Sequence, residues 1–185
     1  MADSNITKNA LAGAMKNLMN QKPFSKINVA DICEMCDMNR KSFYYHFKDK
    51  YDLVNWIYYT EFIETVYSPG VPAASNTWDL FYQICDYFQK NRRFYINALN
   101  VRGQNSFREY FQEVLQPIIR YYLSDIEQDV PNKDLSIVFF TDAFTNALER
   151  WLNEMPSLSS ADFINLMKNI VSMAAKRIDA DNEGA

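Results

Sequence analysis

Residues 38–50 bring hydroxyl, imidazole and cationic side chains together on one short segment. Asn39 can accept a hydrogen bond from a free backbone N–H and so begin a helix there. Phe43 and Phe47 are four residues apart, so both rings fall on one side of that helix and can anchor it to a core. The opposite side and the residues after it supply cations and hydroxyls: Arg40, Lys41, Ser42, Tyr44, Tyr45, Lys48 and Lys50. An anchored helix with this outer surface is suited to contact phosphates and bases in a DNA groove.

The helices that must position this segment are predicted from the spacing of apolar residues on either side of it. Four N-terminal helices are expected, at 6–20, 29–36, 39–47 and from about 50 to 66. Pro23 follows the end of the first, and Asn28 is placed to cap the second. A turn at Asp37 separates the second from the third. Two short helices joined by such a turn, the second exposing cations, form a helix-turn-helix.

The segment 68–72, Ser-Pro-Gly-Val-Pro, is the densest cluster of helix breakers and marks the predicted boundary between a head at 1–66 and a body at 67–185. The body has no strand pattern, so an all-α fold is expected. Its apolar residues predict helices at 78–88, 94–100, 107–127, 135–155 and 161–178. Pro117 has no N–H to donate to the carbonyl four residues earlier, so its helix is expected to kink or split.

Two helices of the body have more apolar surface than a single chain covers. Segment 135–155 has apolar residues on more than one side, and 161–178 adds a clean apolar stripe. A second copy of the chain would cover both, so a homodimer interface is predicted here. The alternative is one well-packed monomeric bundle.

Charge is distributed unevenly over the 185 residues. The net charge is −4, but residues 1–55 carry eight Lys/Arg and six Asp/Glu, a balance of +2, which leaves −6 for the remainder. A basic head on an acidic body suits a protein that presents one surface to phosphate. The three cysteines indicate a reducing compartment, and the sequence has neither an export signal nor an apolar run of membrane-spanning length. A cytoplasmic protein with no membrane partner is expected.

The sequence gives little support for a metal-binding, redox or catalytic role. Cys33 and Cys36 fall on the apolar side of a predicted helix, and no second cysteine pair exists, so they are interpreted as structural thiols. His46 is the only histidine, and its neighbours position no nucleophile or carboxylate. There is no Gly-rich phosphate loop. No catalytic residues, metal or cofactor are predicted, and the protein is not expected to be an enzyme.

The order of these elements and the amino-acid sequence of residues 27–56 resemble the DNA-binding head of the TetR family of bacterial transcriptional regulators. The stretch 43–50, Phe-Tyr-Tyr-His-Phe-Lys-Asp-Lys, is the most specific part. The resemblance implies a homodimer whose heads read a palindromic operator in double-stranded DNA. It also implies that the helical body is a ligand-binding, regulatory and dimerisation domain.

Position by position, the resemblance assigns DNA contacts to the second helix cap, the recognition helix and the start of helix four. These residues are Asn28, Asn39, Arg40, Lys41, Ser42, Tyr44, Tyr45, His46 and Lys50. Asp37 departs from the pattern, because it replaces the Gly that the family usually has in the turn. An Asp adopts the left-handed conformation less readily than Gly but more readily than most residues.

Two modes of control remain open for the body. In the first, the protein is a sequence-specific repressor released by a small apolar or aromatic effector, for which the candidate contacts are Tyr82, Tyr110, Phe111, Tyr121, Phe144 and Trp151. In the second, a protein co-regulator docks on the body and the chain acts as an activator, as in the dihydroxyacetone-kinase regulator subgroup that the head also resembles. A closed cavity of several hundred Å³ would favour the first, and a solid core with an exposed apolar patch the second.

Overall fold

The computed structural model describes residues 2–63, 76–123 and 132–183, and every regular element within these ranges is helical. The head contains α1 (Ala2–Met19), the 3₁₀ turn η1 (Phe24–Lys26), α2 (Val29–Met35) and α3 (Arg40–His46). Helix α4 (Lys50–Tyr58) continues as the π-helical η2 (Tyr59–Ile63). The body contains α6 (Thr77–Lys90), α7 (Arg92–Leu99), α8 (Phe107–Leu123), α9 (Lys133–Glu154) and α10 (Ser160–Glu183). The predicted all-α fold is confirmed.

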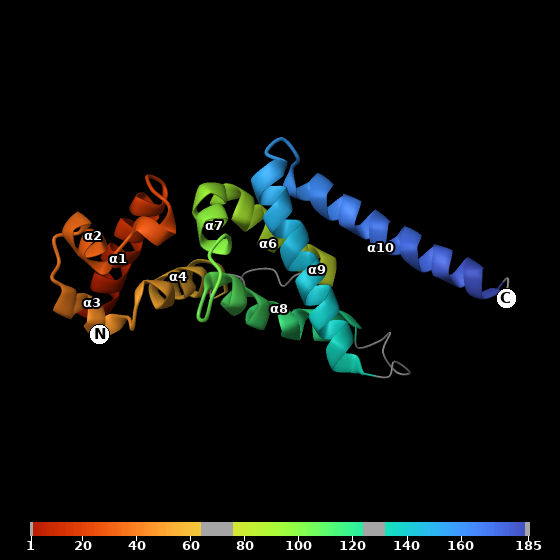
Figure 1. Ribbon diagram of the computed structural model, residues 1–185, viewed down its shortest axis with the longest axis horizontal. Coiled ribbons are helices and arrows are strands. Elements are labelled where there is room, and N and C mark those ends of the chain that lie inside the picture. Colours follow the sequence, from red (N-terminus) through yellow and green to blue (C-terminus); the bar gives the residue numbers. More distant parts are fainter. Residues whose placement is uncertain (1, 64–75, 124–131, 184–185) are drawn as a thin grey trace.

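Figure 1 shows the head at one end of an elongated molecule, with α4 leading from it to the body. Helices α6 to α9 pack together in the middle, and α10 extends away toward the end opposite the head. The predicted head boundary at 68–72 and the predicted end of helix four at residue 66 lie outside the described residues.

The head is held together by a core to which α1, α2, α3 and α4 all contribute. Met15 and Phe43 are fully buried, and Phe47 is nearly so, as the spacing of the two phenylalanines predicts. The rings of Phe43 and Phe47 lie 5.9 Å apart, and Trp56 of α4 packs on Phe47 at 5.6 Å. Complete burial of such rings stabilises each site by about 1.5–3 kcal/mol relative to exposure.

A cluster of aromatic rings forms the centre of the body. Phe88 of α6 lies 4.3 Å from Tyr95 of α7 and 5.1 Å from Phe111 of α8, measured between ring centroids. Tyr58, near the end of α4, meets this cluster edge-on and lies 5.9 Å from Phe111. Because these rings are almost completely buried, α4 belongs to the head core at its start and to the body core at its end.

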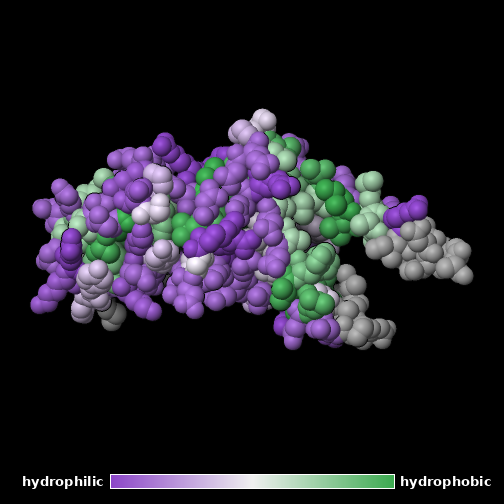
Figure 2. Space-filling model, viewed as in Figure 1, coloured by the Kyte–Doolittle hydropathy of each residue, from purple (hydrophilic) through white to green (hydrophobic). Residues whose placement is uncertain are grey.

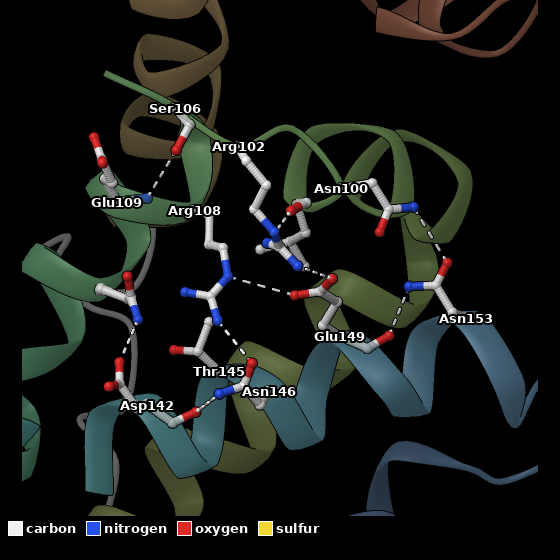
Figure 3. Close-up of polar contacts among 12 residues, drawn as sticks. Asn100, Arg102, Ser106, Arg108, Glu109, Asp142, Thr145, Asn146, Glu149 and Asn153 are labelled. Atoms are coloured by element: carbon white, nitrogen blue, oxygen red, sulfur yellow. Dashed lines mark hydrogen bonds and ion pairs between the residues drawn. The ribbon is translucent and has the colours of Figure 1, made fainter. Parts of the chain in front are cut away.

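Glu149 of α9 organises a polar network that ties α9 to α8 and to the connection before it (Figure 3). Its Oε1 lies 2.6 Å from the Arg102 guanidinium, and its Oε2 lies 3.4 Å from Nε of Arg108. Arg108 also donates to Oδ1 of Asn146 at 2.8 Å. Since the Glu149 and Arg108 side chains are only 15% and 16% exposed, this ion pair fixes how the two helices sit against each other.

Helix α8 runs through Pro117 without a break. The sequence predicts a kink or a split at this proline, and the split is wrong because the helix is continuous. Both Pro117 and Glu113, whose carbonyl loses its usual donor, are exposed. Water can hydrogen-bond that carbonyl, and the other residues of the helix keep it continuous.

An apolar surface remains uncovered on α9 and α10 (Figure 2). On α9 it includes Leu135, 64% exposed, and Phe139, 64% exposed; on α10 it includes Ile170, 51% exposed, and Met173, 69% exposed. Val138 and Leu166 lie on the same two helices and are 46% and 47% exposed. The other side of α9 is buried in the body through Phe144, Leu148 and Trp151.

Candidate nucleic-acid interface

Helix α3 is anchored on one side and open on the other. Its N-cap is Asn39, whose Oδ1 accepts from the Ser42 N–H at 2.8 Å, as predicted. Phe43 fixes the inner side to the core. On the outer side Arg40 and Lys41 are exposed, and Tyr44 and Tyr45 are 58% and 83% exposed. Large aromatic side chains that are this exposed, next to two cations, form a surface that can bind a polyanion.

The turn between α2 and α3 depends on a left-handed residue. Asp37 has φ of 53°, which most residues with a side chain avoid. The Met38 N–H donates to the Cys33 carbonyl at 2.8 Å, and the Asp37 N–H donates to the Glu34 carbonyl at 3.3 Å. This pair of hydrogen bonds is a Schellman motif, which normally places Gly at the left-handed position. Asp37 therefore holds the conformation that the resemblance assigns to Gly.

Asn28 is the N-cap of α2, as predicted, and forms a reciprocal capping box with Asp31. The Asp31 N–H donates to Oδ1 of Asn28 at 3.0 Å, and the Asn28 N–H donates to Oδ2 of Asp31 at 3.0 Å. Lys22 reaches the same carboxylate at 2.7 Å. The hydrogen bond from Lys22 and that from Asn28 lower the pKa of Asp31. The Asn28 side chain is exposed at the start of α2.

Lys50 lies where the resemblance expects a phosphate contact, but its ammonium is directed inward. Nζ donates to the carbonyls of Phe24, at 2.9 Å, and Ile27, at 2.6 Å, and lies 4.3 Å from the centre of the Phe24 ring. Partial burial lowers its pKa, an effect opposed by the charge of Asp31. Two of its three N–H donors are engaged, which leaves one for a DNA phosphate.

An open groove of 590 Å³ lies between the start of α2, α3 and the start of α4. Four of the predicted DNA-contacting residues meet there: Asn28, Arg40, Tyr44 and Lys50. Ser25 and Asp49 line the same groove and were not predicted from the sequence. The Asp49 carboxylate accepts the N–H groups of Tyr51 and Asp52, at 2.8 and 2.9 Å, so it serves as the N-cap of α4.

The other predicted contacts lie along the rest of α3. The rings of Tyr45 and His46 meet edge to face at 4.9 Å, and His46 in turn lies 6.4 Å from the buried Phe47. His46 is half-buried, so the imidazole supports the exposed Tyr45 from the side of the core. The two hydrogen bonds from Ser42 to the Asn39 side chain leave the Ser42 hydroxyl facing the first turn.

The thiols of the head have surroundings that suit packing. Cys33 is buried, and Cys36 is half-buried with its Sγ 3.2 Å from the Ile32 carbonyl. Burial raises the pKa of both thiols, so they stay protonated near neutral pH. Within the described ranges no three His, Cys, Asp or Glu side chains are grouped as metal ligands would be.

Comparison with known proteins decides between the possible uses of this surface. Residues 11–57 match the family model described as bacterial regulatory proteins, tetR family, and residues 76–173 match that of a transcriptional regulator C-terminal region. The chain belongs to the TetR family. It is a DNA-binding transcriptional regulator, and its family and fold are those of regulators rather than enzymes.

One curated relative among TetR-like regulators is the HTH-type dhaKLM operon transcriptional activator DhaS of Lactococcus lactis subsp. lactis. It is 33% identical over 66 residues, which span 36% of this chain and only 35% of that protein.

No helix within the described ranges is long and apolar enough to cross a membrane.

Solved structures of TetR-type regulators share the fold. A TetR regulator from Streptococcus agalactiae is 21% identical, with a TM-score of 0.68 over 92% of this chain and 96% of that one. A structure titled dihydroxyacetone kinase operon activator DhaS is 20% identical, with a TM-score of 0.59 over 95% and 97% of the two chains. NalD of Pseudomonas aeruginosa, the secondary repressor of the MexAB-OprM efflux pump, is 18% identical, with a TM-score of 0.58 over 90% and 96%.

The six residues predicted to contact an effector occupy different places in the TetR-type body. Tyr110 and Phe111 adjoin the ring cluster around Tyr58, whereas Phe144 packs on Phe81 at 4.8 Å. Trp151 stacks on Phe163 at 4.7 Å and donates its indole N–H to the Leu158 carbonyl. Tyr82 and Tyr121 are 41% and 76% exposed. The structure does not bring the six together around one space.

Proposed function

We propose that the protein binds a palindromic operator as a homodimer and regulates transcription from it, with one copy of α3 from each protomer in the major groove. The observation that carries this proposal is the outer side of α3, where Arg40, Lys41, Tyr44 and Tyr45 are exposed on a helix anchored by buried Phe43. Arg40 is the best candidate for a base contact, and Tyr44 and Lys50 for contacts to the backbone phosphates. As a regulator of bacterial transcription it is proposed to act in the cytoplasm.

The homodimer is supported by the uncovered apolar surface of α9 and α10. Phe139 and Met173 are 64% and 69% exposed, although both belong to helices whose other sides are buried in the body. A twofold axis that pairs α9 and α10 with their copies would bury this surface. A palindromic DNA site matches that symmetry.

The test is a fluorescence-polarisation titration of the purified protein against its own upstream intergenic DNA and a scrambled duplex, at two salt concentrations. Tighter binding to the native sequence, weakening as salt rises, is expected because released counterions contribute to phosphate binding. Equal affinity for both duplexes, or no response to salt, would contradict sequence-specific binding through α3. Sedimentation of the same sample reports whether the DNA-binding form is a dimer.

A second candidate mode is an activator controlled by a protein partner in place of a repressor released by a small molecule. It is favoured by the mutual packing of the body's rings, with Phe88 4.3 Å from Tyr95. A hollow between Phe24, Tyr51, Val101 and Phe107 is too small to hold a water molecule. The curated relative is named as a transcriptional activator.

The sign of regulation is measured directly with a reporter fused to the bound promoter. Deleting the gene lowers expression if the protein is an activator and raises it if the protein is a repressor. A small apolar effector is sought in the polarisation titration, because it would change the DNA affinity of the purified protein without any second protein present.

A further inference from the structure

The side-chain amide of Asn97, in α7 of the body, is bound to the backbone of the head. Its Nδ2 donates to the carbonyl of Met19 at 2.7 Å and to that of Lys22 at 3.2 Å. Its Oδ1 accepts from the Phe24 N–H at 3.4 Å. Asn97 is half-buried, so these hydrogen bonds are partly shielded from water.

The carbonyls that Asn97 binds are otherwise short of donors. Met19 is the last residue of α1, and the final carbonyls of a helix have no partner within it. The same connection is held from the other side by Lys50, which donates to the Phe24 and Ile27 carbonyls. Asn28, the N-cap of α2, follows directly. The connection that leads into the helix-turn-helix is thus fixed at one side by the body and at the other by α4.

A second link joins the connecting element to Lys16, in the last turn of α1. Glu61 lies in the π-helical η2, and its carboxylate is 2.7 Å from Nζ of Lys16. The Tyr87 hydroxyl of α6 donates to the same carboxylate at 3.0 Å, and the Tyr95 hydroxyl of α7 donates to Tyr87 at 3.0 Å. Lys16 and Met19 are three residues apart, so both links act on the same end of α1. Rotation of the head on the body would break them.

We propose that Asn97 is a positioning residue that sets the orientation of the head on the body and, in the dimer, the separation of the two recognition helices. This inference rests on the proposed function, because it concerns a dimer bound to two half-sites. Asn97 touches no DNA itself. It acts through the end of α1 and the connection to α2, so its loss affects how rigidly the separation is kept as well as how tightly DNA is bound.

The experiment uses Asn97→Asp, which keeps the shape of the side chain but replaces the N–H₂ donor with an oxygen facing two carbonyls. Asn97→Ala removes the same hydrogen bonds without adding charge and serves if the first variant does not fold. The matched control is Asn100→Asp, at the end of the same helix, because the Asn100 amide donates to Asn153 of α9 and not to the head. Each protein is titrated with the operator selected by the wild type from random DNA, and with versions that add or remove base pairs between the half-sites.

A rigid dimer prefers one spacing, because each added base pair moves and rotates one half-site relative to the other. We expect the wild type and Asn100→Asp to show the same sharp optimum. The Asn97 variants are expected to lose about tenfold in affinity at that spacing and to distinguish neighbouring spacings less well, since the head is no longer preorganised. A spacing profile as sharp as that of the wild type would overturn the inference, whether or not the overall affinity falls.

Amide hydrogen exchange of residues 20–27 in the free proteins separates this inference from the function on which it rests. Faster exchange in Asn97→Asp than in Asn100→Asp supports the contact, and equal exchange overturns it. If the wild type selects no DNA from the random pool, the proposed function fails. The exchange result then still decides whether Asn97 holds the head to the body.

Discussion

Arg40 lies in the first turn of α3, exposed and at the groove that Asn28 and Tyr44 also line. If it makes a bidentate contact with guanine, Arg40→Ala weakens binding to the operator by about 1–3 kcal/mol and binding to random DNA much less. Arg93→Ala is the control, because it removes an exposed cation from the body and leaves the same net charge. The measurement is polarisation titration with both duplexes. Equal losses on operator and random DNA would assign Arg40 to phosphate contact alone.

Asp37 occupies a left-handed position at the end of α2, where a Cβ atom is unfavourable. Asp37→Gly is therefore expected to raise the free energy of unfolding by about 1 kcal/mol, measured by thermal or urea denaturation. Asp37→Ala keeps the Cβ and lacks the polar group that helps Asp tolerate this conformation, so it is expected to be no more stable than the wild type. A less stable glycine variant would show that the Asp37 side chain contributes more than its backbone costs.

The residues that could be predicted from the sequence are those whose role depends on near neighbours. The capping by Asn28 and Asn39 and the burial of Phe43 follow from spacings of three or four residues, and the structure confirms them. Lys50 differs, because its ammonium binds carbonyls more than twenty residues away, which no local pattern reveals. Asn97 was missed for the same reason, since its partners lie at the far end of α1.

At the scale of elements, α2 depends on an ionised carboxylate at its start. The pKa of Asp31 is lowered in the folded state from its ordinary value of 3.8. Its contribution to stability is therefore present above that value and is lost as pH falls through the lower folded value. We expect the melting temperature to fall in that acidic range and Asp31→Asn to show a smaller fall. An identical pH profile for the variant would show that other carboxylates dominate. Circular dichroism over an acidic range, from about pH 6 down to about pH 2.5, makes the comparison.

The packing of α8 on α9 depends on Glu149, which is shared by Arg102 and Arg108. Glu149→Gln leaves a largely buried guanidinium without its counter-ion and is expected to cost about 1.5–3 kcal/mol of unfolding free energy. The control is Glu154→Gln on the same helix, where the carboxylate is 63% exposed and lies 3.8 Å from Arg150. Exposed pairs of this kind contribute about 0–1 kcal/mol. Equal effects of the two substitutions in urea denaturation would contradict the structural role of the network.

The spacing of apolar residues predicted where the helices lie, but not whether a helix continues through a proline or changes to a π-helix at its end. Pro117 favours a break by local chemistry, yet α8 continues through it, and both Pro117 and Glu113 are exposed residues. Helix α4 was expected as one regular helix, whereas its end is the π-helical η2 that carries Glu61 toward Lys16 and Tyr87. A π-turn is set by such tertiary contacts and has no local sequence pattern.

For the whole molecule, the aromatic residues of the body fall into two groups, one in the core and one on the surface, which composition alone does not separate. Tyr58, Phe88 and Tyr95 fill the core where α4 enters the body, so they join the head to the body. Phe139 is on the surface with the aliphatic residues of α9 and α10. The two groups cannot be told apart by spacing, because α9 carries apolar residues on both of its sides.

The uncovered side of α9 and α10 therefore carries the last prediction, which concerns assembly. Ile170→Glu places a carboxylate in the proposed interface and is expected to raise the dimer dissociation constant by more than about tenfold, since burying an unpaired charge is costly. Ile6→Glu is the control, because Ile6 is 65% exposed in the head and Ile170 is 51% exposed. Analytical ultracentrifugation over a range of concentrations makes the measurement. If Ile170→Glu dimerises as tightly as Ile6→Glu, the interface lies elsewhere. If it is a folded monomer that no longer prefers paired half-sites, this apolar surface is linked to operator recognition.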